Sequence, residues 1–237
     1  MGRLKTVFFD IGGTLIDIQS EKSSHLKVLD ATRVRYGLDL STTELHKKFV
    51  TYLKRYEPAQ VRKWTPILQL IIQAFEDEMA KLGIKVSSRD SQWFLNTYLT
   101  SYRQGIKLTE GAMETLRLAK QFNLHIGILS DVDDKWAQSI LDKLKIYPFL
   151  DSITTSESVG VGKPNPKIFL SALRKANCMP EEAMHVGDSL EKDVLGAKNM
   201  GMIATHIDPN PSPAADFKIK TISELVPIIQ NLVEAKL

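Results

Sequence analysis

The chain has a single cysteine, Cys178, among its 237 residues. One cysteine cannot form a disulfide within the chain, which fits a reducing compartment, and we expect a cytoplasmic protein. Apolar stretches approaching the ~20 residues that span a bilayer are also missing. The short apolar run that precedes Asp10 is too brief for a signal peptide. The sequence therefore predicts neither a disulfide-stabilised secreted protein nor a membrane protein.

Blocks of one charge sign are absent as well. The 31 Lys and Arg residues and the 28 Asp and Glu residues are spread along the chain and leave a formal net charge of +3. This balance gives no reason to expect nucleic acid as a partner, although a mildly basic surface suits a small anionic substrate. With 43% hydrophobic and 25% charged residues, the composition is that of a globular protein. It leaves the oligomeric state open.

The segment from about residue 20 to residue 105 has the pattern of helices rather than strands. Ser41-Thr42-Thr43-Glu44 is a capping box, which marks the start of a helix. The stretch Trp64–Leu82 keeps apolar residues at helical spacing and ends at Gly83. We expect about four helices here, packed into one compact insert.

The rest of the chain alternates between short apolar strands and amphipathic helices. Strands are expected at Thr6–Phe9, Leu124–Leu129, Ser152–Thr155, Ala183–Val186 and Met202–Ile207. Helices are expected at Met113–Phe122, Lys135–Leu144, Pro166–Asn177 and Leu190–Met200, and after the capping box Thr221–Glu224. Such alternation predicts an α/β fold with a Rossmann-like parallel sheet covered on both faces. We place a core domain at residues 1–16 and 105–237, and an inserted helical domain at residues 17–104.

Polar residues follow the ends of these strands, at the edge of a parallel sheet where ligands bind. They are Asp10, Ser130-Asp131, Gly160–Pro164 and Gly187–Ser189. Two neighbouring carboxylates repel each other and so favour a cation between them, and oxygen ligands select a hard ion such as Mg²⁺. Such an ion and Lys163 would together offset the charge of a phosphate. Asp10 could then attack phosphorus and form an acyl-phosphate.

These residues also resemble the motifs of the haloacid dehalogenase-like (HAD) hydrolase superfamily. Asp10–Leu15 (DIGGTL) is similar to motif I, usually D-x-D-G-T-L, and Ser130 to motif II. Lys163-Pro164 is similar to motif III and Gly187–Asp193 to motif IV. The four motifs occur in order and cover residues 1–20 and 105–215. The helical insert resembles the mobile C1-type cap of subfamily I.

The resemblance implies a magnesium-dependent phosphatase that acts on a small phosphomonoester through an aspartyl-phosphate. Asp10 would be the nucleophile and, with the backbone carbonyl of Gly12 and the carboxylate of Asp188, would bind the metal. Asp193 would orient the water shell of the metal or the catalytic Lys163. The phosphoryl group would contact residues from three motifs, namely Thr14, Ser130, Asp131 and Lys163.

The main departure from the family pattern is Gly12. In family phosphatases this position is an aspartate that protonates the leaving group and later activates water. Glycine can do neither, and a positioned acid–base typically contributes ~10²–10⁴-fold to the rate. Substitutes could come from the cap or from the acidic run after Ser130, which contains Asp131, Asp133 and Asp134. A Gly12→Asp variant is expected to be a better phosphatase unless another residue already supplies this function.

Because residue 12 is a glycine, functions other than that of a phosphatase stay open. Haloalkanoate dehalogenases also lack this aspartate and need no metal, but they typically lose the Gly-Asp pair that is intact here as Gly187-Asp188. Phosphonate hydrolases keep magnesium and use a cap lysine, for which no candidate stands out. A pseudoenzyme that retains the phosphate and metal site is the alternative outside enzymes.

Other polar and aromatic residues have simpler explanations. The cations Lys54, Arg55, Arg62 and Lys63 could recognise a second anionic group, but such runs are more often solvated helix faces. The tryptophans Trp64 and Trp93 are expected in the core of the insert. Four candidates are left. The histidines do not show a metal-ligand spacing and the cysteine has no partner base nearby, so we expect structural roles for His125, His185, His206 and Cys178.

Overall fold

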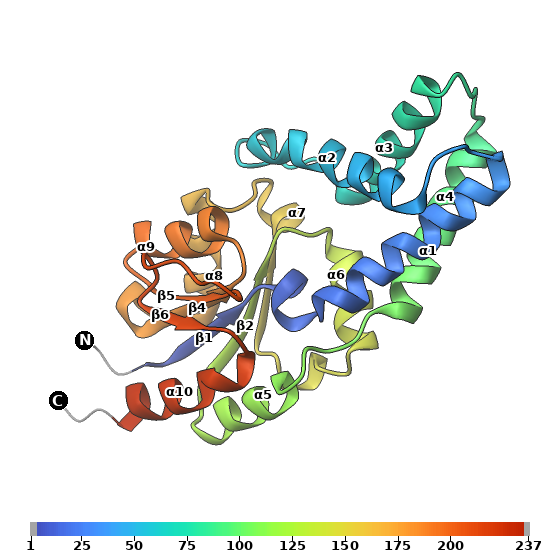
Figure 1. Cartoon of the computed structure of the whole chain (residues 1–237). Helices are drawn as coiled ribbons and strands as arrows, with labels where there is room; N and C mark the ends of the chain where they lie inside the picture. Colours follow the sequence, from blue (N-terminus) through green and yellow to red (C-terminus); the bar gives the residue numbers. More distant parts are fainter. Residues whose placement is uncertain (1–3, 235–237) are drawn as a thin grey trace.

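The computed structural model describes residues 4–234 and contains one six-stranded, fully parallel sheet (Figure 1). Its strand order is β3-β2-β1-β4-β5-β6. The strands are β1 (Thr6–Phe9), β2 (His125–Ser130), β3 (Ser152–Thr155), β4 (Ala183–Gly187), β5 (Ile203–Ile207) and β6 (Phe217–Ile219). The α/β, Rossmann-like fold class is confirmed. The short edge strand β6 was not expected.

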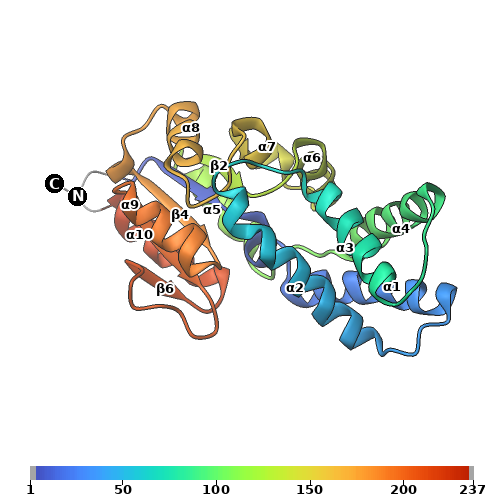
Figure 2. The same ribbon diagram turned by 90° about the horizontal axis from the view of Figure 1, so that it is seen from above.

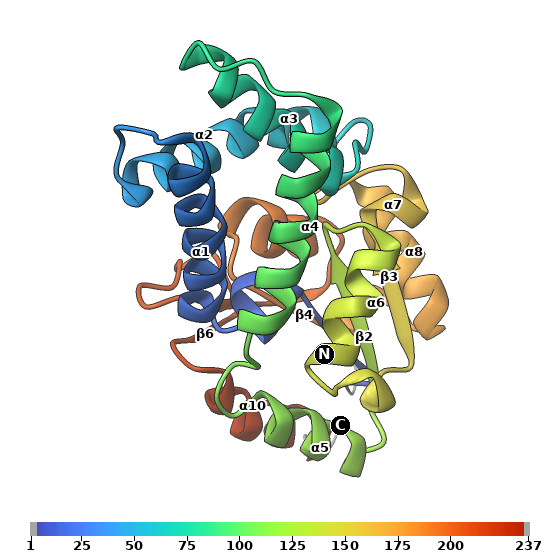
Figure 3. The same cartoon turned by 90° about the vertical axis from the view of Figure 1, so that its right-hand side faces the viewer.

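Both faces of the sheet are buried, as the apolar runs of its strands require. Alternate residues of β1 point to opposite faces, so Val7 and Phe9 belong to one apolar cluster and Phe8 to another. The first cluster includes α5 (Ala112–Gln121), α6 (Asp134–Lys143) and α10 (Leu225–Glu234), and α5 and α10 lie side by side (Figure 3). The second includes α8 (Pro166–Ala176) and α9 (Gly196–Asn199), which follow the short α7 (Ser156–Val159).

One expected helix is split in the structure. The segment Leu190–Met200 starts with a wide helical turn, Leu190–Leu195, before the short helix α9 begins at Gly196. In the wide turn the backbone amides of Asp193 and Val194 both bond to the carbonyl of Ser189. The turn also brings the Asp193 carboxylate back to the amide of Ser189, 3.0 Å away.

Residues 18–105 form four helices, which we call the helical unit. They are α1 (Ile18–Tyr36), α2 (Thr42–Gln60), α3 (Ile67–Lys81) and α4 (Ser88–Gly105). The long helices α1 and α4 pack side by side, and α2 and α3 lie against them (Figure 3). The capping box at Ser41 is confirmed. In the core of the helical unit, the rings of Phe75 and Phe94 stack with their centroids 4.4 Å apart. A division into separate domains at residues 17 and 104 stays a prediction.

Two adjacent segments connect the helical unit to the sheet. Ile16 and Leu108 form an antiparallel bridge. The amide of Asp17 donates to the carbonyl of Lys107 at 3.0 Å, and the amide of Thr109 donates to the carbonyl of Leu15 at 2.9 Å. The Asp17 side chain also caps α1, so this helix starts directly after the bridge at Ile16. No helix among residues 4–234 combines the length and apolar character that crossing a bilayer demands.

Candidate active site

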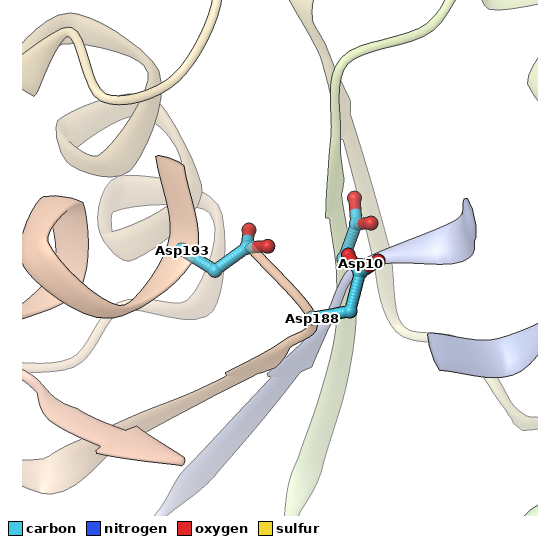
Figure 4. Close-up of side chains that lie close together, drawn as sticks. All are labelled: Asp10, Asp188 and Asp193. Atoms are coloured by element: carbon cyan, nitrogen blue, oxygen red, sulfur yellow. The ribbon is translucent and has the colours of Figure 1, made fainter. Parts of the chain in front are cut away.

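Three aspartates meet at the carboxyl edge of the sheet. Asp10 follows β1 and Asp188 follows the adjacent strand β4, so the pairing of these strands brings the two residues together. Asp193 comes from the wide turn after β4. One carboxylate oxygen from each of the three side chains lies within 4.8 Å of the other two (Figure 4). The structure thus brings together the two carboxylates that the strand ends predicted to share one crevice.

Two glycines make this approach possible. Gly13 adopts a positive φ of 64°, which favours glycine, and a Cβ at this position would collide with the Asp188 carboxylate. A Cβ at Gly187 would collide in the same way with the carboxylate of Asp193. The glycines in the two motifs therefore make room for the carboxylates.

Lys163 lies at the centre of this cluster and is 2% exposed. Its Nζ donates to Asp10 Oδ1 at 2.8 Å, to Asp193 Oδ1 at 2.5 Å and to a backbone carbonyl of β2 at 3.2 Å. Burial alone would lower the pKa of Lys163, but the surrounding carboxylates, Asp10 first, raise it above its ordinary value. Lys163 is therefore a buried ammonium.

Asp193 is the most completely bonded carboxylate of the cluster. It accepts from Lys163, from the Ser189 amide at 3.0 Å, and lies 2.8 Å from His185 Nε2. Burial would raise the pKa of Asp193, but Lys163 and His185 bring it below its ordinary range. Of the two roles expected for Asp193, the structure shows the contact with Lys163.

The charges of the cluster do not balance. Three carboxylates face one ammonium, which leaves two negative charges uncompensated if all are ionised. Burial, together with the charges of Asp10 and Asp193, raises the pKa of Asp188 to about 7. Burial also raises the pKa of Asp10, against the effect of Lys163. A divalent cation would remove this imbalance, and an oxygen-only ligand set suits a hard ion. The residues therefore fit a metal site.

Comparison with known proteins agrees with this geometry. Residues 4–201 match the haloacid dehalogenase-like hydrolase family. The chain belongs to this family. A glyceraldehyde 3-phosphate phosphatase from Methanopyrus kandleri is 28% identical over 242 residues, which cover 97% of this chain and 98% of the relative. The expected superfamily is confirmed.

Solved structures are similar over nearly the whole chain. The putative HAD-hydrolase YfnB from Bacillus subtilis, bound to magnesium, has a TM-score of 0.82 at 20% identity and covers 97% of this chain and 100% of its own. At this identity the likeness shows the fold. An HAD phosphatase from Thermococcus onnurineus has a TM-score of 0.69 at 26% identity, covering 95% of this chain and 98% of its own.

Three further residues of this HAD-like hydrolase were expected to contact phosphate, and the structure places each of them. Among residues 4–234, the buried hydroxyl of Thr14 has no hydrogen-bond partner, and its contact with phosphate stays a prediction. Ser130 is the buried last residue of β2, the strand beside β1. The Asp131 carboxylate accepts from the Ser156 hydroxyl at 2.5 Å and from the Lys163 amide at 2.9 Å. It braces the loop that carries Lys163, and its contact with substrate stays a prediction.

The other acidic residues after Ser130 are engaged elsewhere. Asp133 accepts from the indole N–H of Trp64 at 3.1 Å and from the amides of Ile67 and Leu68 at 2.8 and 3.1 Å. It thereby caps α3, whose own N-cap residue is Pro66 and offers no side-chain cap. Asp134 accepts from the Thr155 hydroxyl. These contacts make Asp133 and Asp134 poor substitutes for the acid–base missing at Gly12.

The structure adds a residue that the sequence analysis missed. Glu21, on the first turns of α1, points its carboxyl group toward Gly12. The hydroxyl of Tyr102, on α4, donates to Glu21 Oε1 at 2.5 Å. In the sequence Glu21 is one of many charged residues on a helix of low amphipathicity, so no signal distinguished it.

The remaining candidates have structural contacts or face solvent. His206 Nε2 lies 2.9 Å from the Asp188 carbonyl and its Nδ1 accepts from the amide of Ser212. His125 Nε2 lies 2.8 Å from the hydroxyl of Ser152. The four cations considered for a second anionic group are exposed: Lys54, Arg55, Arg62 and Lys63.

Proposed function

We propose that this chain is a magnesium-dependent phosphatase that hydrolyses a small phosphomonoester through an aspartyl-phosphate on Asp10. The observation that carries the proposal is the arrangement of the Lys163 ammonium between Asp10 and Asp193, with Asp188 completing the cluster. Relatives named glyceraldehyde 3-phosphate phosphatase support the reaction and suggest a substrate of similar size. The location of this protein in the cytoplasm is a prediction from its single cysteine.

Magnesium would be held by the carboxylates of Asp10 and Asp188 and the backbone carbonyl of Gly12. When bound, it supplies the positive charge that offsets the phosphate and the uncompensated carboxylates. Magnesium bound to YfnB, which shares this fold, is in keeping with such a site.

The chain's own residues carry the chemistry. A carboxylate oxygen of Asp10 attacks phosphorus, the bond to the leaving oxygen breaks, and water later cleaves the acyl-phosphate. Lys163 holds Asp10 in place and offsets phosphate charge, and Asp193 fixes Lys163 in its turn. Thr14 and Ser130 would donate their hydroxyls to phosphate oxygens. Removing any of these donors is expected to weaken the stabilisation of the transition state.

The helical unit would act as a cap of the C1 type, which the sequence predicts at residues 17–104. The segment between α2 and α3 lies over the loop that carries Lys163 (Figure 2). The amide of Gly162 donates to the carbonyl of Gln60 at 2.7 Å, and the amide of Trp64 donates to the carbonyl of Gly160 at 2.8 Å. A segment in this position favours a small substrate that it can enclose.

The test is turnover of p-nitrophenyl phosphate and of small sugar phosphates, with magnesium and after its removal by EDTA. We expect turnover that EDTA abolishes and magnesium restores. Halide release from 2-haloalkanoates without metal would instead support a dehalogenase, which the Asp188 carboxylate in the cluster argues against. A rise in melting temperature with magnesium or phosphate, without turnover, would support a pseudoenzyme.

A further inference from the structure

Glu21 is held at a fixed place beside motif I. Its amide bonds to the carbonyl of Asp17 at 3.0 Å, in the first turn of α1. Asp17 is itself bonded to Lys107 across the two connecting segments. The Glu21 side chain is therefore positioned by the junction between sheet and helical unit.

The carboxyl group of Glu21 occupies the space in front of Gly12. A Cβ built on Gly12 would lie 3.9 and 4.0 Å from the two Glu21 carboxyl oxygens. Outside Gly12's own turn and its chain neighbours, these are the only heavy atoms of the described residues within 4 Å of that point. Gly12 has φ −68° and ψ 136°, a conformation open to any residue. A side chain from position 12 would thus point at the Glu21 carboxyl group.

The two carboxyl oxygens of Glu21 face different groups. Glu21 is half-buried, and its Oε2 is the oxygen nearer to the point that a Cβ on Gly12 would occupy. A general acid–base must place an oxygen within hydrogen-bond reach of the proton that it transfers. Tyr102 fixes the Oε1 atom from α4 at 2.5 Å.

We propose that Glu21 is the general acid–base of this enzyme and supplies, from helix α1, the carboxyl group that Gly12 lacks. This inference rests on the proposed phosphatase function. When Asp10 attacks phosphorus, the bond between phosphorus and the leaving oxygen breaks, and the Glu21 carboxyl gives its proton to that oxygen. Water then attacks the acyl-phosphate, Glu21 takes a proton from the water, and the bond between Asp10 and phosphorus breaks. The cycle releases an alcohol and phosphate and returns Glu21 to its protonated form.

A Glu21→Gln variant tests the proposal with leaving groups of different basicity. An alkyl phosphate such as glycerol 2-phosphate needs a proton on its leaving oxygen, so we expect its turnover to fall by ~10²–10⁴-fold. p-Nitrophenolate leaves without a proton, so the first step should survive with p-nitrophenyl phosphate. We expect a burst of about one p-nitrophenolate per active site, followed by slow release, because the water step lacks its base. The burst also shows that the folded Asp10 site is intact.

Rescue from position 12 separates an acid–base role from a structural one. In the Glu21→Gln background, Gly12→Asp should raise alkyl-phosphatase turnover at least about tenfold above that of the single variant, because it puts a carboxyl group into the same space. Gly12→Asn in that background is the matched control and should restore none. In the wild-type background, Gly12→Asp should bring no gain, since two facing carboxylates repel each other.

The outcomes distinguish this inference from the proposed function. Wild-type enzyme without magnesium-dependent turnover of any phosphate ester would overturn the phosphatase and the role of Glu21 with it. Active wild type with an equally active Glu21→Gln variant would overturn only the role of Glu21. An inactive Glu21→Gln variant that shows no burst, or that Gly12→Asp and Gly12→Asn rescue equally, would also contradict an acid–base role.

Discussion

The carboxyl edge of the sheet and the helical unit contribute to the active site in different ways. At the sheet edge, Asp10, Lys163 and Asp188 come from distant parts of the sequence and are brought together by the strand order. The helical unit contributes Glu21, whose place depends on the rotation of one helix about its axis. Topology alone positions residues at strand ends, whereas a helix must also present the correct face.

The two regions also differ in what stabilises them. The sheet edge concentrates buried charge around one ammonium, an arrangement that serves chemistry better than stability. The helical unit is held by capping boxes and by stacked rings such as Phe75 and Phe94. Substitutions at the sheet edge should therefore change turnover most, and substitutions far out on the helical unit should change stability alone.

Asp10→Asn should have the largest effect on turnover. It removes the nucleophile, so we expect magnesium-dependent hydrolysis of p-nitrophenyl phosphate to fall by at least about 10⁴-fold. Its melting temperature should be equal or higher, because one of the repelling carboxylates is gone. Steady-state assay and thermal unfolding check the two expectations, and residual turnover above a tenth of wild type would contradict the assignment.

Lys163→Met should have the largest effect on stability. It leaves Asp10 and Asp193 buried without their ammonium, and breaking such a buried pair costs about 3–5 kcal/mol. Urea unfolding without metal measures this cost. Lys192→Met is the matched control, because its bond to the half-exposed Glu57 is worth only about 0–1 kcal/mol. Equal losses of unfolding free energy in the two variants would mean that burial of Lys163 with Asp10 and Asp193 has no effect on stability.

Gly13→Ala should be worse than Gly12→Ala, although the residues are neighbours. At Gly13 the positive φ costs about 1–3 kcal/mol for a residue with a Cβ, and the methyl group pushes against Asp188. Gly12→Ala has an ordinary φ and should stay within about 0.5 kcal/mol. Unfolding free energies and the rise in melting temperature with magnesium report both effects. A Gly13→Ala variant that keeps the full magnesium response would argue against Asp188 as a ligand.

Ser41→Ala should have the smallest effect. It removes the cap of α2, where Ser41 and Glu44 bond to each other's amides, and should cost about 1 kcal/mol. Turnover should be unchanged, because the capping box lies at the start of α2 and, among the described residues, makes no hydrogen bond to the cluster around Lys163. A loss of turnover larger than the loss of folded protein would show that the two regions are coupled more tightly than their contacts indicate.

The sequence predicted most of the fold because its strands are short and alternate regularly with amphipathic helices, and because β1, β4 and β5 are fully buried. Thr6–Phe9 and Ser152–Thr155 were predicted with the bounds that the structure shows. The edge strand Phe217–Ile219 was missed because three residues of mixed burial give no readable period. The grouping of Asp10, Lys163 and Asp188 was predictable from strand ends.

Contacts made by helix faces could not be predicted in this way. Asp133 caps a helix that lies far from it in sequence, and only the proline at the start of α3 hinted that a cap was needed. Glu21 faces Gly12 because of how α1 leaves the bridge at Ile16. Three-dimensional packing, rather than any local pattern, determines both positions.

The paired segments at Ile16 and Leu108 are placed where a hinge between the sheet and the helical unit would lie. Any swing of the helical unit about them would carry the turn near Trp64 through a wide arc and break its bond to Gly160, while Glu21, next to the pivot, would scarcely move. Substrate could thus enter at the far edge while the proton donor kept its place beside Gly12.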